Sequence, residues 1–170
     1  MLDRRGGSES LRAARWITPI FPHYKINFDG AVFSEQQVAG LGVMIRGCYG
    51  RVIAAMAEHI PVPICAEIVE ALACQRALTF ARELNISDSV SEGDAEIMIK
   101  SLFARDVSHL EYGHVIQGVL FIASGFQVFN FPHDKRLGNS VAHFLAKCAK
   151  LGNELQVWFE SIPDDIAPLF

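Results

Sequence analysis

The alternation of apolar and polar side chains predicts that the folded part of the chain begins with three consecutive strands. Between positions 24 and 29 every second residue is apolar, which is the period of a strand with one buried face. Two more strand-like stretches follow at 38–46 and 51–58, and Pro61 ends the third. Short turns between neighbouring strands predict that the three pair as an antiparallel meander.

After Pro61 the pattern changes to helices that alternate with single strands. Apolar and small residues recur at helical spacing in the longer segments, and short alternating runs lie between them. The expected elements are a helix at 64–84, a strand at 89–94, a short helix at 95–103, a helix at 112–124, a strand at 126–131 and a helix at 137–151. This order predicts the α/β class, with a mixed five-stranded sheet of three antiparallel strands and then parallel ones, flanked by helices.

Length and composition fit one domain with a leader and a tail. The chain has 170 residues, 51% of them hydrophobic, which is enough for a single sizeable core. Residues 1–20 lack apolar periodicity and are expected to form a disordered leader before a folded domain at 21–152. Residues 153–170 are expected to form a tail that either docks on a partner or folds back on the core.

The charge is unevenly distributed along the chain. The net charge is −4, but the first twenty residues carry four arginines and two acidic residues, so the remaining residues together carry −6. Binding to nucleic acid through bulk electrostatics depends on Lys and Arg that neutralise phosphates, and an acidic body argues against it. Nucleic-acid binding in which divalent cations supply part of the positive charge is still compatible with this composition.

The sequence favours an intracellular protein of the cytoplasm or nucleus that has no membrane partner. No apolar run is long enough to cross a bilayer, and the start of the chain lacks the pattern of a secretion signal. The four cysteines form no CxxC pair and lie among apolar residues, so buried thiols are expected and not disulfides or a zinc site. Arg and Ser in the leader also fit an organelle transit peptide, although Asp3 and Glu9 count against it.

Several carboxylates interrupt segments that otherwise predict buried elements. Asp29 ends the first strand, where the following glycine also permits the simpler interpretation of a turn cap. Glu67 and Glu70 lie near the start of the helix at 64–84, where an acidic residue either faces solvent favourably or must be satisfied on the Ala-rich packing face. Asp94 ends the fourth strand, and the predicted topology brings that strand beside the first.

Asp29, Glu70 and Asp94 would therefore converge at one place in the predicted fold. Carboxylates within a few ångströms raise one another's pKa unless cations lie between them. Clusters made of oxygen ligands alone select Mg²⁺ or Mn²⁺, and a pair of such ions drives phosphodiester hydrolysis. The three carboxylates thus indicate a two-metal site.

The motifs around these carboxylates resemble those of a known family. They are KINFDGA at 25–31, VEALACQRAL at 69–78, EGD at 92–94, HDKR at 133–136, Asn139, and AHFLA at 142–146. In this order and spacing they resemble the type 1 ribonuclease H family, specifically the plant domain found with, or derived from, reverse transcriptases of non-LTR retroelements. The resemblance extends over about residues 24–150 and implies the ribonuclease H-like fold.

The resemblance also implies the roles of individual residues. Asp29, Glu70 and Asp94 are expected to bind Mg²⁺ or Mn²⁺, and Glu70 is preferred to Glu67 because its spacing to Asp94 and the Ala-Leu-Ala that follows match the family pattern. His133 is expected on a loop that assists proton transfer or product release.

His143 occupies the fourth metal-ligand position, where many members have Asp although plant relatives often carry His. Imidazole supplies no negative charge and suits Mn²⁺ or Zn²⁺ better than Mg²⁺, so reduced or altered activity is plausible.

The function implied by the resemblance is hydrolysis of the RNA strand of RNA–DNA hybrids. The alternative is a catalytically weak or inactive domesticated retroelement domain that binds nucleic acid, which the acidic body and His143 favour. A protein-interaction domain is a third possibility without support from particular residues. The candidate phosphate contacts are Lys25, Arg46, Lys135, Arg136 and Lys147, although for each of them the pattern favours an ordinary solvated surface charge.

Overall fold

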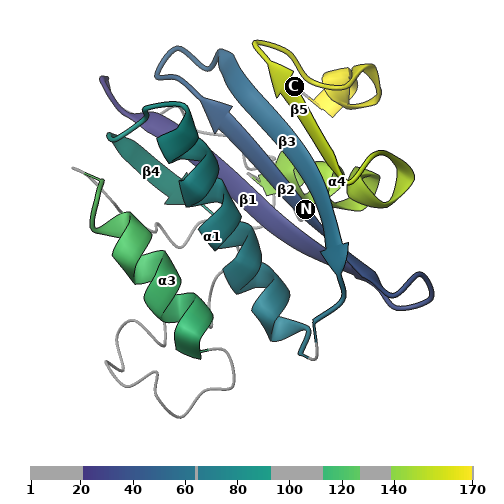
Figure 1. Ribbon diagram of the computed structural model, residues 1–170. Coiled ribbons are helices and arrows are strands. Elements are labelled where there is room, and N and C mark those ends of the chain that lie inside the picture. Colours follow the sequence, from purple (N-terminus) through teal and green to yellow (C-terminus); the bar gives the residue numbers. More distant parts are fainter. Residues whose placement is uncertain (1–20, 64, 93–112, 127–138, 170) are drawn as a thin grey trace, which may run out of the picture.

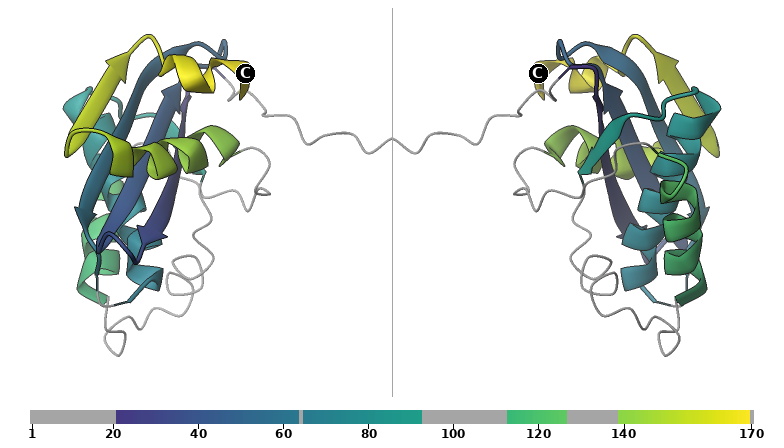
Figure 2. Two further views of the ribbon diagram at one scale, coloured as in Figure 1. Left: turned by 90° about the vertical axis from the view of Figure 1, so that its right-hand side faces the viewer. Right: turned by 90° about the vertical axis from the view of Figure 1, so that its left-hand side faces the viewer.

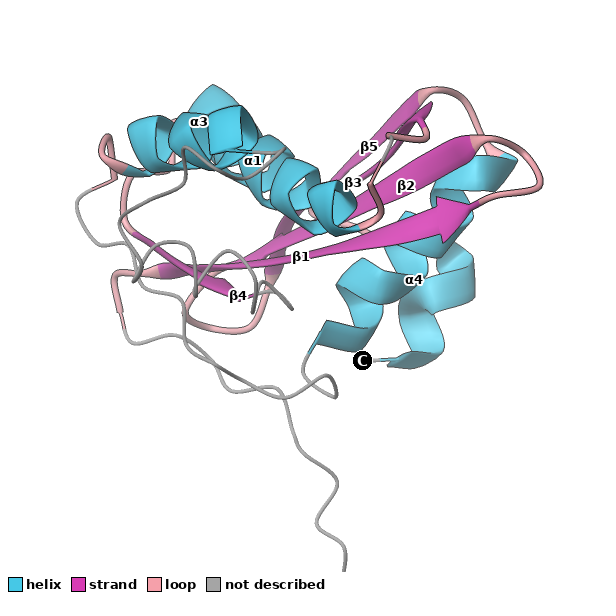
Figure 3. Ribbon diagram, turned by 90° about the horizontal axis from the view of Figure 1, so that it is seen from below, coloured by secondary structure: helices cyan, strands magenta, loops and turns pink. Residues whose placement is uncertain are grey.

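A five-stranded sheet lies between two layers of helix in the computed structural model, which describes residues 21–63, 65–92, 113–126 and 139–169 (Figure 1). The elements are β1 (Tyr24–Phe33), β2 (Val38–Arg46), β3 (Val52–Pro61), α1 (Glu67–Glu83), β4 (Ser89–Glu92), α3 (Gly113–Ala123), α4 (Ser140–Cys148), β5 (Leu155–Phe159) and the 3-10 helices η2 (Ala149–Leu151) and η3 (Asp164–Leu169). Helices α1 and α3 cover one face of the sheet, and α4 covers the other (Figure 3). No helix in these ranges is both long and apolar enough to cross a membrane.

The strand order is β4-β1-β2-β3-β5. β2 pairs antiparallel with both β1 and β3, and β4 pairs parallel with β1, beginning with Tyr24 opposite Ser89. The predicted meander and the predicted place of the fourth strand beside the first are therefore present. The predicted strand at 126–131 lies outside the described residues except for Phe126, as does the short helix at 95–103.

The last strand of the sheet lies within residues 153–170, which the sequence predicts to be a tail. β5 pairs antiparallel with β3 from Leu155 opposite Glu58 to Phe159 opposite Ala54, and it forms an edge of the sheet (Figure 2). Ile166 of η3 is fully buried under the same sheet. Of the two behaviours expected for this segment, the structure shows the one in which it folds back on the core.

The alternation along β1 divides the core into two clusters. Ile26 and Phe28 lie in the cluster between the sheet and α1, together with the predicted Ala-rich face of that helix, whose Ala73 and Ala77 are completely buried. The second cluster joins the sheet to α4 and η3 and contains Met44, Ala55, Ala57, Val141, Leu145, Ala149 and Ile166. The remaining side chains of β1, with Asp29 among them, face this second layer.

Two of the candidate phosphate contacts are buried, which corrects the expectation that they are surface charges. Lys25 and Arg46 expose only 4% and 6% of their area and lie opposite each other in the β1–β2 register. The strand alternation places Lys25 beneath the layer of α4, so neither side chain is open to a ligand. Lys147 is exposed on α4, whereas Lys135 and Arg136 lie outside the described residues.

The cysteines form no disulfide, as the sequence predicted. Cys74 is buried on α1, and Cys48, Cys65 and Cys148 are half-buried. Burial raises the pKa of the Cys74 and Cys148 thiols, with smaller contributions from Glu70 and Asp165 respectively. Both thiols therefore stay protonated at neutral pH and behave as packing groups.

Candidate functional site

A buried aspartate and a histidine form the best-defined part of the site. Nδ1 of His143 on α4 lies 2.5 Å from Oδ2 of Asp29 on β1, and their side chains expose 51% and 11% of their areas. An ionised carboxylate only accepts hydrogen bonds, so Nδ1 carries the hydrogen and donates it. In the neutral ring Nε2 is then the acceptor nitrogen.

Two glycines on β2 allow α4 to approach the sheet closely enough for this contact. A Cβ atom at Gly42 would overlap the carbonyl oxygen of Ala142, and one at Gly40 would overlap that of Ala146. Gly42 also pairs with Asp29 in the β1–β2 register, so the helix backbone next to His143 lies directly beside the aspartate.

Replacing Gly42 by Ala is expected to push α4 away from the sheet. The added methyl group meets backbone atoms, which cannot rotate aside, so we expect a loss of about 1–3 kcal/mol in the free energy of unfolding and a weaker Asp29–His143 contact. Denaturant unfolding measures the first effect. Gly47→Ala is the matched control because the nearest atom to its Cβ would be 3.6 Å away, and equal stability of the two variants would contradict the close approach.

Asn139 fixes the start of α4 to β1. Its side-chain Nδ2 donates a hydrogen bond of 2.7 Å to the carbonyl oxygen of Phe28, the residue before Asp29. The described ladder between β1 and β4 ends at Asn27, one residue earlier. Asn139 appeared in the sequence only as one position of a motif, and this anchoring role could not be seen there.

Helix α1, which carries Glu70, lies on the opposite face of the sheet from α4 (Figure 3). Gly30 allows this helix to approach β1 closely, because a Cβ atom there would lie 2.6 Å from Cγ1 of Val69 and 3.2 Å from its carbonyl carbon. The Glu70 side chain interacts with the Asp29 carboxyl. Two carboxyl groups that approach each other repel unless they share a proton or a cation lies between them.

Burial dominates the electrostatics of Asp29. It raises the pKa of this carboxyl above its ordinary value, and the opposing effects of His143, the Gly30 backbone N–H and the Glu70 side chain are too small to cancel it. Ionised oxygen ligands in a buried place fit a hard divalent ion, Mg²⁺ or Mn²⁺. Within the described ranges, however, no three His, Cys, Asp or Glu side chains form a group that could hold a metal ion.

The raised pKa predicts that Asp29→Asn stabilises the metal-free protein at neutral pH. The folded state holds the Asp29 proton more tightly than the unfolded state does. The free energy of unfolding therefore falls as the pH rises from the ordinary pKa of about 3.9 through the raised pKa of the folded state, and it stays lower at higher pH. We expect Asn to raise Tm at pH 7 by on the order of 2 °C, and the gain to disappear near pH 3.

Thermal unfolding in EDTA at the two pH values measures this difference. Asp164→Asn in η3 is a suitable control because Asp164 is exposed. A lower Tm for Asp29→Asn than for wild type at pH 7 would contradict the dominance of burial over the His143 contact.

Three of the predicted site residues lie in the described part of the chain. Asp29 is hydrogen-bonded to His143 from one face of the sheet and interacts with Glu70 of α1. Asp94 and His133 lie outside the described residues. The rival carboxylate Glu67 is the first residue of α1, and its side chain also lies outside the described part.

The sheet order, the helices on both faces and the carboxylates around β1 define a ribonuclease H-like α/β fold. Solved structures share it: the RNase H1 of the halophilic archaeon Halobacterium salinarum has a TM-score of 0.67 at 22% identity and matches 75% of this chain and 97% of its own. The chain belongs to the reverse transcriptase-like family, whose model matches residues 27–149. This confirms the ribonuclease H resemblance found in the sequence.

Two further solved structures resemble the chain to a similar degree. The N-terminal RNase H domain of a Mycobacterium tuberculosis protein has a TM-score of 0.65 at 21% identity, over 75% of this chain and 92% of that one. LC11-RNase H1, solved in complex with an RNA/DNA hybrid, has a TM-score of 0.64 at 20% identity, over 74% and 95% of the two chains. No curated protein matches the sequence.

Proposed function

We propose that the protein is a metal-dependent endonuclease that hydrolyses the RNA strand of RNA–DNA hybrids. The observation that carries the proposal is the buried Asp29 carboxylate in contact with both Glu70 and His143. Family membership supports it, as does the shared fold of LC11-RNase H1, which was solved with an RNA/DNA hybrid. A retroelement origin, as in the plant domains that the sequence resembles, agrees with the reverse transcriptase-like family.

We propose Asp94 as the third carboxylate of the site. In the parallel register Asn27 pairs with Glu92, and Asp29 and Asp94 each follow two residues later in their segments. Asp29, Glu70 and Asp94 would together hold Mg²⁺ or Mn²⁺, with His143 at the fourth position. When bound, such ions supply a deprotonated water and stabilise the leaving oxygen of a phosphodiester.

The chain's own residues orient this site. Asp29 accepts the hydrogen from Nδ1 of His143, so the acceptor Nε2 of the neutral ring is the nitrogen left to ligate an ion or to take a proton. The half-exposed ring lies at the solvent side of Asp29, where a substrate phosphate can approach. His133 is proposed to assist proton transfer or product release.

A strand-specific cleavage assay tests the proposal. We expect Mg²⁺ or Mn²⁺ to support cutting of the RNA strand of a labelled hybrid and not of duplex DNA, because a shallow minor groove that displays 2′-hydroxyls distinguishes RNA from DNA. EDTA should stop the reaction. Equal cutting of duplex DNA would contradict hybrid specificity.

A second candidate is a binding domain with little or no activity. The observation that favours it is the hydrogen bond from His143 to Asp29, which occupies one oxygen of the central carboxylate. An aspartate at position 143 would instead add a negative charge there. Hybrid binding without cleavage in either metal would select this function. We propose an intracellular location, in the cytoplasm or nucleus, which agrees with four cysteines that form no disulfide.

A further inference from the structure

The solvent-facing side of α4 and η2 carries positive charge in a chain whose net charge is −4. His143, Lys147 and Lys150 follow one another at intervals of four and three residues, which places them on one helical face, and all three are exposed. Residues 140–151 contain no acidic residue. These three side chains are called the α4 basic stripe below.

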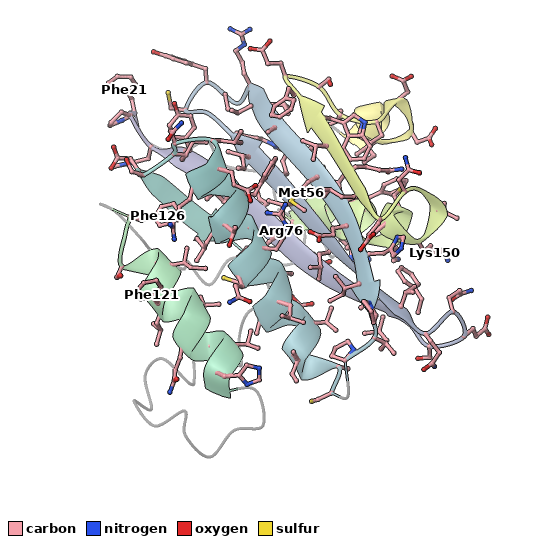
Figure 4. The ribbon with its side chains drawn as sticks, viewed as in Figure 1. Phe21, Met56, Arg76, Phe121, Phe126 and Lys150 are labelled. Atoms are coloured by element: carbon pink, nitrogen blue, oxygen red, sulfur yellow. The ribbon has the colours of Figure 1, made fainter. Side chains whose placement is uncertain are left out.

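The basic stripe is held against β1 at both of its ends. His143 contacts Asp29 at one end, and at the other the Lys150 ammonium lies 4.8 Å from the centre of the Phe33 ring. Asp29 and Phe33 are four residues apart on the same strand, so the stripe starts at the carboxylates and follows β1 toward the β1–β2 turn. Figure 4 labels Lys150 beside the helical segment that follows α4.

We propose that the α4 basic stripe binds backbone phosphates of the nucleic acid on one side of the position that is cut. This inference rests on the proposed function, since it extends the same site. Lys147 and Lys150 are three residues apart, which is about 5 Å along the helix axis, so their ammonium groups can reach neighbouring phosphates of one strand. Lysine ammonium groups bind phosphate as point charges.

Phe33 gives Lys150 a defined place within this surface. A cation over an exposed aromatic face gains modest attraction, which restricts an otherwise flexible side chain without neutralising its charge. The ammonium can therefore still bind a phosphate oxygen. Lys25 and Arg46, the other described candidates, are buried, so Lys147 and Lys150 are the exposed lysines near the site in the described residues.

Lysines near the end of a helix also interact favourably with the helix dipole, and this effect alone would explain their positions. The two roles make different predictions. A purely structural role changes the melting temperature and leaves nucleic-acid affinity and its dependence on salt unchanged. Phosphate binding changes both the affinity and the salt dependence, because each neutralised phosphate releases counterions.

The experiment measures binding of a fluorescent RNA–DNA hybrid to the full chain in EDTA, where cleavage is absent, at several KCl concentrations. For Lys147→Ala with Lys150→Ala we expect at least a tenfold loss of affinity at low salt. The slope of log K against log[salt] should become shallower by about 1.5 to 2. Lys147→Arg with Lys150→Arg should retain wild-type binding, and Phe33→Leu should weaken it about twofold.

Arg51→Ala with Arg82→Ala is the matched control. It removes the same charge from exposed positions elsewhere, and Arg82 lies in the last turn of α1, where it has the same relation to a helix dipole. An equal loss in this control, or a wild-type slope in the lysine variant, would overturn the stripe. Polyglutamate serves as a probe for acidic peptides. If the lysine variant lost affinity for polyglutamate but not for the hybrid, the stripe would also be overturned, because that result would indicate a protein partner.

These outcomes separate the stripe from the nuclease. Stripe-dependent binding by a chain that cleaves no hybrid in either metal would support the stripe and refute the proposed activity. If the chain cleaves the hybrid but replacing both lysines does not change its binding, the proposed activity is supported and the stripe is refuted.

Discussion

Replacing Glu70 by Gln is expected to reduce cleavage of an RNA–DNA hybrid by at least about a hundredfold. Glu70 contacts Asp29 directly, and the amide keeps its size while removing the charge that would hold a divalent ion. Single-turnover cleavage of a labelled hybrid in Mg²⁺ and Mn²⁺ measures the loss. The shift of Tm on adding metal provides a readout that does not depend on catalysis and should shrink in the same variant.

Glu67→Gln is the control for this experiment. Glu67 lies three residues earlier on α1, and its replacement should largely spare turnover. The reverse result, with Glu67→Gln inactive and Glu70→Gln active, would assign the helix carboxylate of the site to Glu67.

The second large effect is expected at His143. Asp at this position would add a negative charge beside Asp29, so His143→Asp should raise Mg²⁺-dependent activity by about tenfold, whereas the wild type should work better with Mn²⁺. Initial rates in both metals measure these differences.

His143→Asp also makes a prediction about the protein without metal. It replaces a hydrogen-bond donor to the buried Asp29 carboxylate with a second carboxylate, so the metal-free melting temperature should fall and metal should restore it. Unchanged metal preference in His143→Asp would place His143 outside the metal site.

The central part of the site was predictable because it breaks a pattern. Asp29 stands in a stretch whose alternation otherwise marks a buried strand, and Glu70 lies on an Ala-rich helical face that the structure buries. His143 is identified only through its motif, because a single histidine within an amphipathic helix has no distinctive signal of its own. Its hydrogen bond joins residues 114 positions apart, a separation that periodicity cannot bridge.

Other features depend on contacts that the sequence does not encode locally. β5 was missed because only its ends are well exposed and no regular alternation marks it as a strand. Long basic side chains are usually found at the surface, and the sequence therefore predicts Lys25 and Arg46 there. In the fold both side chains are buried. Asn139 acts through a backbone carbonyl, and a sequence shows no trace of which carbonyl a side chain will reach.

β5 determines where the polypeptide chain can be truncated without opening the sheet. Similarity to the reverse transcriptase-like family ends at residue 149, before β5 begins, so a boundary chosen from that similarity would remove the strand that covers β3. The β3 edge would then present open backbone donors and acceptors over 54–58, and such edges recruit strands from other molecules. A shortened chain would thus be prone to self-association even though every residue around Asp29 was retained.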